Sequence, residues 1–276
     1  MDLDKLIKDE INFFSKIKKI NKKISNENLA NFRMETIQQR RERISLELYS
    51  LCSETIQYGP FKGLKLDNDN WWGASDIGTQ CLGLYEYELL NFIENINENQ
   101  YSNFINIGAA DGYYAIGFLF SKKVKRSICF EQSKVGQETI LKNWEKNDRP
   151  GQILIYDKAE PNSFTEKIEK YLEEDSLFLI DIEGNEFNLL NKAVLSKLSN
   201  SFIIIEIHNW VDNFEDKYIK LLRDANEFFT IEIIESLNRP IHSRKELDHF
   251  HEDNKFLLLS EGRPNRMRHL KLSPRI

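Results

Sequence analysis

The chain has 276 residues, of which 41% are hydrophobic and 12% aromatic; this is enough apolar content for a sizeable core and excludes a wholly disordered protein. Its formal net charge is −6, so it lacks the overall basic field that holds nucleic acid, and we expect no nucleic-acid partner. Its longest apolar runs, about six residues, are too short for a membrane span, and with its acidic first residues they predict a cytoplasmic protein.

Helical patterns dominate the first hundred residues. Apolar residues recur at helical spacing over 3–20 and over 27–57, and a shorter helix is expected over 82–93. We therefore expect residues 1–100 to form a helical and looped extension that also covers the cofactor, and residues 101–276 to form the main domain. The length of the second helix suggests a surface for pairing two copies in a homodimer.

From residue 101 onward, apolar strands alternate with helical segments. The strands are apolar on both faces, as a sheet covered by helices on both sides requires. The pattern predicts an α/β, Rossmann-like fold with a mostly parallel seven-stranded sheet, the last strand antiparallel. The expected strands are 103–107, 126–130, 153–156, 177–182, 202–208, 229–234 and 255–259, and the helices between them extend to about 120 and over 133–146, 162–173, 185–198 and 214–226.

The most informative segment is FINIGAADGYYAIG at 104–117, which reads as a strand, a turn of small residues and a helix. Small residues let backbone N–H groups approach a ligand, and the positive end of the following helix points at it. At the end of the next strand, Glu131 offers a carboxylate to both ribose hydroxyls. These features are typical of the first crossover of a nucleotide-binding fold.

The spacing of the small residues, G-x-A-x-G from Gly108 to Gly112, indicates which nucleotide binds. A dinucleotide fingerprint needs a third glycine for tight packing of helix on strand, and Tyr113 at that position is too bulky. The spacing is closer to the G-x-G-x-G loop of class I S-adenosylmethionine (SAM)-dependent methyltransferases. SAM is the expected cofactor, and an NAD(P)-dependent oxidoreductase is the alternative.

Polar side chains follow the core strands, and in an open parallel sheet these strand ends meet at the ligand-binding edge. Asp157 there suits the exocyclic amine of adenine. Asp181 and Glu183 share one face, as do Glu206 and His208. His208 is the candidate general base, with Asp181 and Glu206 positioning the proton. Two alternatives stay open: Asp181, Glu206 and His208 hold a divalent metal such as Mg²⁺ or Mn²⁺, or the carboxylates only bond backbone amides.

These motifs resemble those of the FkbM-type SAM-dependent methyltransferases. The resemblance rests on FINIGAADG, on IDIEGNEFNLL at 180–190, which is similar to the family's D-x-E-G-x-E signature, and on the run IEIH; it covers about residues 82–210. It implies a SAM-dependent O-methyltransferase acting on a hydroxyl of a sugar, glycan or other small molecule. Asn106 departs from the family's acid at the strand end, so contact to the methionine ammonium shifts to Glu86 or Asp181. That departure also favours the alternative of a catalytically inactive, methyltransferase-like binding protein.

Further candidates for the site come from the segment GLYEYE before the core and from the long connector 238–253, which lies on the active-site side if the sixth strand is parallel. The basic tail after residue 260 is expected to be structural or to face a partner. The residues expected to bind the cofactor are Glu86, Asn106, Gly108, Ala109, Ala110, Asp111, Gly112, Glu131, Gln132, Asp157, Lys158, Ala159 and Asp181. Those expected to contact the substrate are Tyr85, Glu183, Trp210, His242 and Arg244.

Overall fold

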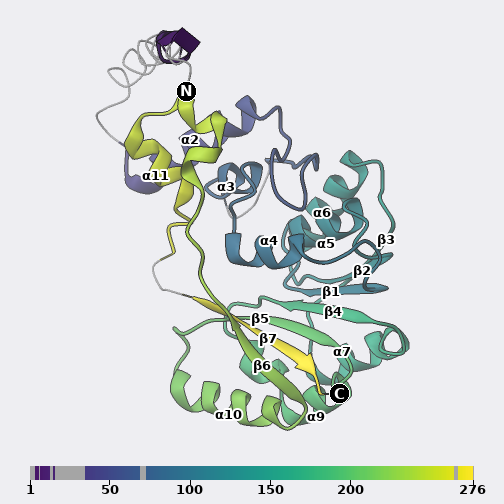
Figure 1. The fold of residues 1–276 in the computed structure, drawn as a ribbon. Coiled ribbons are helices and arrows are strands. Elements are labelled where there is room, and N and C mark those ends of the chain that lie inside the picture. The colour runs from purple at the N-terminus through teal and green to yellow at the C-terminus, as the bar shows by residue number, and fades with distance from the viewer. Residues whose placement is uncertain are drawn as a thin grey trace.

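A seven-stranded sheet with the strand order β3-β2-β1-β4-β5-β7-β6 forms the centre of the molecule (Figure 1). The computed structural model describes residues 4–5, 7–12, 15, 35–68, 73–263 and 267–275. Neighbouring strands are parallel except that β7 is antiparallel to β5 and β6, which confirms the predicted Rossmann-like methyltransferase sheet. The strands are β1 (Asn103–Ile107), β2 (Arg126–Phe130), β3 (Gln152–Tyr156), β4 (Ser176–Ile180), β5 (Phe202–Ile207), β6 (Phe229–Ile234) and β7 (Arg268–Pro274).

Helices cover both faces of this sheet, so each face has its own apolar core (Figure 1). On one face Phe104 of β1 stacks on Phe118 with ring centroids 4.1 Å apart, and on the other Phe130 of β2 meets Phe164 edge-on at 5.2 Å. One face carries α5 (Tyr113–Phe120) and α6 (Lys134–Lys146), and the other carries α7 (Pro161–Ile168), α9 (Lys192–Lys197) and α10 (Phe214–Asn226). Among the shorter elements are α8 (Glu186–Leu189), η1 (Glu169–Tyr171), η2 (Ile241–Ser243) and η3 (Lys245–His249).

The first described helices differ from the prediction at their ends. Within the helix expected over 27–57, helix α2 (Ile37–Leu51) begins at a capping box of Thr36 and Gln39, and residues 27–34 lie outside the described residues. It ends before Ser53, which has a positive φ. Of the helix predicted over 3–20, residues 4–5, 7–12 and 15 are described and are helical, and the others lie outside the described residues.

The helix expected over 82–93 is also displaced. Gly83 and Glu86 have φ of 61° and 45°, which interrupts helical geometry between α3 (Ile77–Cys81) and α4 (Tyr87–Glu94). A side chain at Gly83 would lie 2.3 Å from the Tyr58 carbonyl oxygen, so the chain turns here where two backbone segments touch. In the described residues, no helix is both long and apolar enough to span a membrane.

The last strand is the largest correction. The apolar run at 255–259, predicted as a strand, belongs to helix α11 (Glu252–Leu259), which packs with α2 and α3 (Figure 1). A short apolar run fits a buried helix as well as a strand, and acidic residues in the first turn favour the helix. The strand is β7, inside the tail expected to be structural or to face a partner. Because β7 starts beside the carboxyl end of β5, the loop before it enters the ligand-binding edge.

Candidate cofactor and acceptor site

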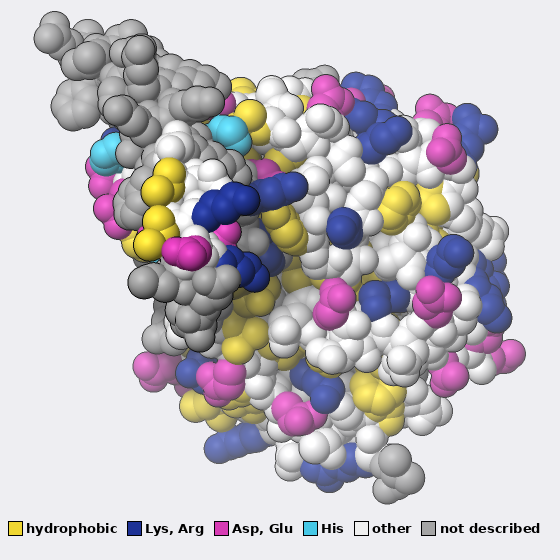
Figure 2. Space-filling view, turned by 45° about the horizontal axis from the view of Figure 1, so that its top comes forward, with side chains coloured by type: hydrophobic (Ala, Val, Ile, Leu, Met, Phe, Trp, Pro, Cys, Tyr) yellow, Lys and Arg dark blue, Asp and Glu magenta, His cyan; other side chains and the backbone are white. Residues whose placement is uncertain are grey.

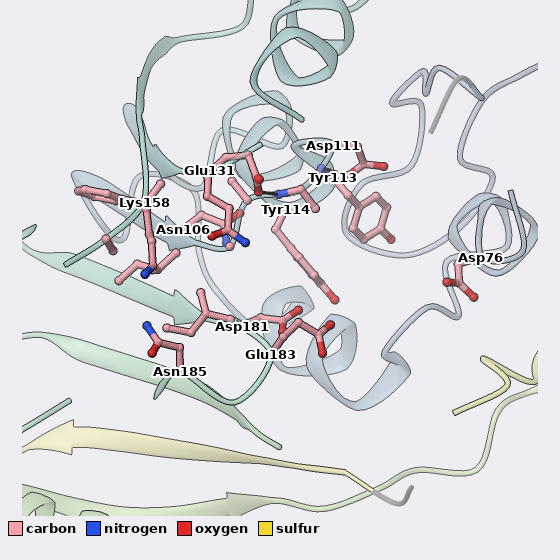
Figure 3. Close-up of a pocket in the computed structure, with 18 of the residues that line it drawn as sticks. Asp76, Asn106, Asp111, Tyr113, Tyr114, Glu131, Lys158, Asp181, Glu183 and Asn185 are labelled. Carbon is pink, nitrogen blue, oxygen red and sulfur yellow. Dashed lines mark hydrogen bonds between the residues drawn. The ribbon is translucent and has the colours of Figure 1, made fainter. Parts of the chain in front are cut away.

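A cavity of about 660 Å³ opens at the carboxyl edge of β1, β2 and β4, where ligands bind in open parallel sheets (Figure 3). Twelve of the predicted site residues line it: Tyr85, Asn106, Gly108, Ala109, Ala110, Asp111, Glu131, Gln132, Lys158, Ala159, Asp181 and Glu183. Eight lining residues were not predicted: Asp76, Gln80, Ile107, Tyr113, Tyr114, Phe130, Ile182 and Asn185. The other predicted residues lie outside the lining: Glu86, Gly112, Asp157, Glu206, His208, Trp210, His242 and Arg244.

The turn after β1 is shaped by contact with the neighbouring strand. Gly108 has a φ of +84°, and a Cβ there would lie 1.6 Å from the carbonyl oxygen of Asp181, which follows β4. Its N–H donates to the carbonyl of Phe130 over 2.9 Å. Gly108 is therefore required where the turn crosses between two strands, and it brings the backbone of the turn to the mouth of the cavity.

Glu131 holds this turn in place. Its Oε2 accepts a hydrogen bond from the N–H of Ala110 over 2.9 Å, and its Oε1 accepts one from the N–H of Ser133 over 2.7 Å. Each carboxylate oxygen has a second lone pair, so Glu131 can still accept from a ligand hydroxyl in the cavity. The residue predicted to bind ribose thus also fixes the loop beneath it.

Several polar atoms of the lining are buried without a hydrogen-bond partner in the described structure. They belong to both acceptors and donors: Gln80 Oε1, Asn106 Nδ2, Asp111 Oδ2, Tyr113 Oη and Asp181 Oδ1. Buried polar groups are ordinarily hydrogen-bonded. In Figure 3, Lys158 lies to one side of Asn106, while Asp111 and Tyr113 lie to the other. The lining therefore suits an elongated ligand with polar groups at both ends.

Asp111 has an unusual environment for a carboxyl group. It is buried within the small-residue turn. Burial raises the pKa of Asp111 to about 6, against the opposing effect of the Tyr113 N–H, which donates to Asp111 Oδ1 over 2.9 Å. A cation close to this carboxyl group would lower its pKa and favour the ionised form.

His208 follows β5 and is fully buried among carboxylates. Its Nδ1 lies 3.1 Å from Glu186 Oε1, which also accepts from the His208 backbone N–H over 3.0 Å. Its Nε2 lies 3.3 Å from Asp181 Oδ1 and 3.5 Å from Glu206 Oε2. Burial by itself lowers the pKa of His208, but Asp181 and Glu186 outweigh it and raise the pKa to about 9. His208 lies outside the cavity lining, and its role as a general base stays a prediction.

Arg263, which was not predicted as a site residue, forms hydrogen bonds with two of the predicted acidic residues. Arg263 donates to Glu206 Oε1 and to Glu86 Oε1, and its Nε donates to Glu261 Oε2 over 2.7 Å. The Tyr114 hydroxyl donates to the other oxygen of Glu86 over 2.5 Å. Both oxygens of Glu86 thus accept hydrogen bonds, and Glu86 itself does not line the cavity. Its predicted contact to the methionine ammonium stays a prediction.

The predicted residue Asp157 lies on the surface. Its side chain is 67% exposed and pairs with Lys134 over 2.6 Å. Its neighbours Lys158 and Ala159 do line the cavity. Asp157 itself does not line the cavity, and its contact to adenine stays a prediction.

The residues predicted to contact substrate from the long connector also lie elsewhere. Arg244 donates to the carbonyl of Leu82 over 3.0 Å, and its guanidinium lies 4.2 Å from the ring centroid of Tyr58. His242 lies in the short helix η2. Arg244 therefore links the connector to the segments that carry Tyr58 and Leu82. Trp210 is 44% exposed and packs edge-on against His208 with ring centroids 4.8 Å apart.

Neither a protein-family model nor a curated protein sequence matches this chain. One similar solved structure is Sp1610 of Streptococcus pneumoniae in complex with S-adenosyl-L-methionine, with 14% identity over 69% of this chain and 73% of that one and a TM-score of 0.42. Another is the Bacillus subtilis M1A22 tRNA methyltransferase TrmK, with 13% identity over 68% of this chain and 65% of that one and a TM-score of 0.43. A third is the precorrin-6y C5,15-methyltransferase of Geobacter metallireducens, with 10% identity over 68% of this chain and 89% of that one and a TM-score of 0.44. Likenesses of this degree carry no argument about the reaction. The assignment of the fold rests on the strand order and strand directions.

Proposed function

We propose that the chain is a class I SAM-dependent methyltransferase of the FkbM type, which transfers a methyl group to a hydroxyl of a sugar, glycan or other small molecule. The observation that carries this proposal is the cavity at the carboxyl edge of β1, β2 and β4, with its small-residue turn and Glu131. The unpartnered donors and acceptors of its lining match the mixed polar groups of SAM. SAM supplies the methyl group when bound, and the residues around it hold and orient both reactants.

The proposed cofactor orientation follows the chemistry of the lining. The adenosine half lies toward Glu131, which accepts from ribose hydroxyls, and toward Phe130. The methionine half lies toward the turn, where the Asn106 amide donates to its carboxylate and Asp111 Oδ2 accepts from its ammonium. This arrangement accounts for Asn106 in place of an acid, because Asp111 supplies the missing negative charge.

The proposed role of Asp111 predicts a pH dependence of cofactor binding. With a pKa of about 6, the carboxyl is mostly ionised at pH 7 and mostly neutral at pH 5, where it no longer attracts an ammonium. SAM affinity is expected to fall about tenfold from pH 7 to pH 5, in step with the loss of the ionised form. Calorimetric titration of SAM at both pH values measures this. Asp111→Asn should bind weakly at both, with little change between them; an equal fall in the variant would contradict the assignment.

The acceptor is proposed to approach from the side of Asp181 and Glu183, which line the cavity beside Asn185 (Figure 3). Carboxylates there suit hydroxyl groups, which donate to them, and repel a phosphate backbone. On the face shown in Figure 2, acidic and basic side chains are interspersed, and the formal net charge of the whole chain is −6. A neutral, hydroxyl-bearing acceptor fits these charges better than a nucleic acid.

Transfer of labelled methyl groups tests this function. The full chain is incubated with methyl-labelled SAM and fractions of a cell extract that contain glycans, small molecules or RNA. We expect label in a hydroxyl-bearing glycan or small molecule. Label in RNA would contradict the proposed acceptor class, and no transfer to any fraction, with SAM bound, would favour the inactive binding protein.

A further inference from the structure

We propose that Asp181, Glu206 and His208 bind one divalent cation of the Mg²⁺ or Mn²⁺ class at the edge of the cavity. The ion would hold the acceptor hydroxyl beside the methyl donor. This catalytic role rests on the methyltransferase function proposed above, whereas binding of the ion does not.

The spacing of the three side chains fits one ion. One donor atom from each residue can be chosen so that all three lie within 4.8 Å of one another. His208 Nε2 lies 3.3 Å from Asp181 Oδ1 and 3.5 Å from Glu206 Oε2. Neighbouring ligands at right angles about an ion, at about 2.1–2.5 Å, would lie roughly 3.0–3.5 Å apart. The two separations from His208 Nε2 are therefore close to those that an octahedral ion requires.

The orientation of His208 points independently to a ligand. Its Nε2 is buried and makes no hydrogen bond within the described structure, and the same is true of Asp181 Oδ1, which lies 3.3 Å away. Nε2 would give up its proton as the ion binds. Its Nδ1 is held by Glu186, which is itself fully buried. Metal-binding histidines commonly have one ring nitrogen bonded to a carboxylate in this way, which directs the other at the ion. Glu186 thus acts as a positioning residue for Nε2.

Charge also favours this cluster over the adjacent one. Glu86, Glu206 and His269 form a second group with similar spacing. There, however, the Arg263 guanidinium bonds both carboxylates and would repel a cation. Arg263 engages Glu206 Oε1, while Oε2 faces His208. A dication is therefore expected on the His208 side of Glu206.

The ion has a direct route to the acceptor because Asp181 lines the cavity and its side chain is 33% exposed. A hydroxyl bound to a divalent ion loses its proton more readily. In the transfer, the oxygen lone pair forms the C–O bond as the C–S bond breaks, with its electron pair going to sulfur. The hydroxyl proton leaves to water, and the products are the methyl ether and S-adenosylhomocysteine.

The experiment titrates the full chain, stripped with a chelator, with Mn²⁺, and follows free Mn²⁺ by electron paramagnetic resonance. We expect one Mn²⁺ per wild-type chain, at least about tenfold weaker binding in both His208→Ala and Asp181→Asn, and a change of less than about twofold in His269→Ala. His269 is the matched control because it belongs to the neighbouring cluster. Melting curves identify any variant that does not fold. If His208→Ala does not fold, Asp181→Asn still tests the site.

Absence of Mn²⁺ binding by the wild type would overturn the inference, as would undiminished binding in Asp181→Asn or an equal loss in His269→Ala. Titration of the same preparations with S-adenosylhomocysteine separates this inference from the proposed function. Binding of S-adenosylhomocysteine without Mn²⁺ would refute only the ion site, and binding of Mn²⁺ without S-adenosylhomocysteine would refute only the methyltransferase.

Discussion

Replacing Gly108 by alanine is expected to weaken S-adenosylhomocysteine binding at least about a hundredfold and to lower the free energy of unfolding by about 2–4 kcal/mol. The new Cβ would lie 1.6 Å from the Asp181 carbonyl oxygen and 3.2 Å from a methyl carbon of Ile182. Backbone atoms there cannot give way as a flexible side chain would, so the turn after β1 must move. Calorimetric titration measures the affinity, and urea denaturation measures the stability.

Gly59→Ala is the matched control for this substitution. Gly59 also has a positive φ, +78°, but the nearest atoms to its Cβ position are 3.8 Å away. It should therefore show only the conformational cost of alanine at positive φ, about 1–2 kcal/mol, with cofactor affinity unchanged. If Gly108→Ala lowers affinity and stability no more than Gly59→Ala, the close contact between the turn after β1 and the Asp181 carbonyl does not shape the site.

His208→Ala is expected to slow methyl transfer by roughly 10²–10⁴ while leaving S-adenosylhomocysteine affinity within about twofold. His208 does not line the cavity, so its loss should spare cofactor binding. It does contact Asp181 and Glu206, whose carboxylates are proposed to organise the acceptor side. Initial rates with the acceptor found by label transfer, measured over a range of SAM concentrations, should show a fall in kcat with little change in the KM for SAM.

His249→Ala serves as the control for His208→Ala because His249 is an exposed histidine of the connector. It should transfer methyl groups at the wild-type rate. A purely structural role of His208 would lower the melting temperature and weaken cofactor binding together. Turnover at the wild-type rate in a folded His208→Ala protein would end the proposed role.

The sheet was largely predictable because its strands combine uninterrupted apolar runs with clear turn residues. Strands β1, β2 and β6 have the predicted bounds. The run at 255–259 misled the prediction because its length and composition fit a helix as well as a strand. The true last strand, β7, alternates buried Leu270 and Leu272 with a more exposed Lys271, a weaker pattern within a basic tail.

The part of the site built on strand ends was predictable, since parallel strands bring their carboxyl ends to one edge. Asp181 and Glu131 follow this rule. The part built by long-range packing was not. Gln80 reaches the cavity from the N-terminal extension, and Arg263 bonds Glu86 across 177 positions of the chain. Such contacts follow no local spacing in the sequence. Because the last strand was predicted at 255–259, the loop that carries Arg263 was not expected at this edge of the sheet.

The central claim is that the cavity after β1 binds SAM, and calorimetric titration with S-adenosylhomocysteine, with NADH as the comparison, tests it most directly. We predict saturable binding of one S-adenosylhomocysteine per chain, its loss in Gly108→Ala, and no binding of NADH. Binding of NADH without S-adenosylhomocysteine would contradict the claim and favour the oxidoreductase. Failure to bind either ligand would contradict it as well.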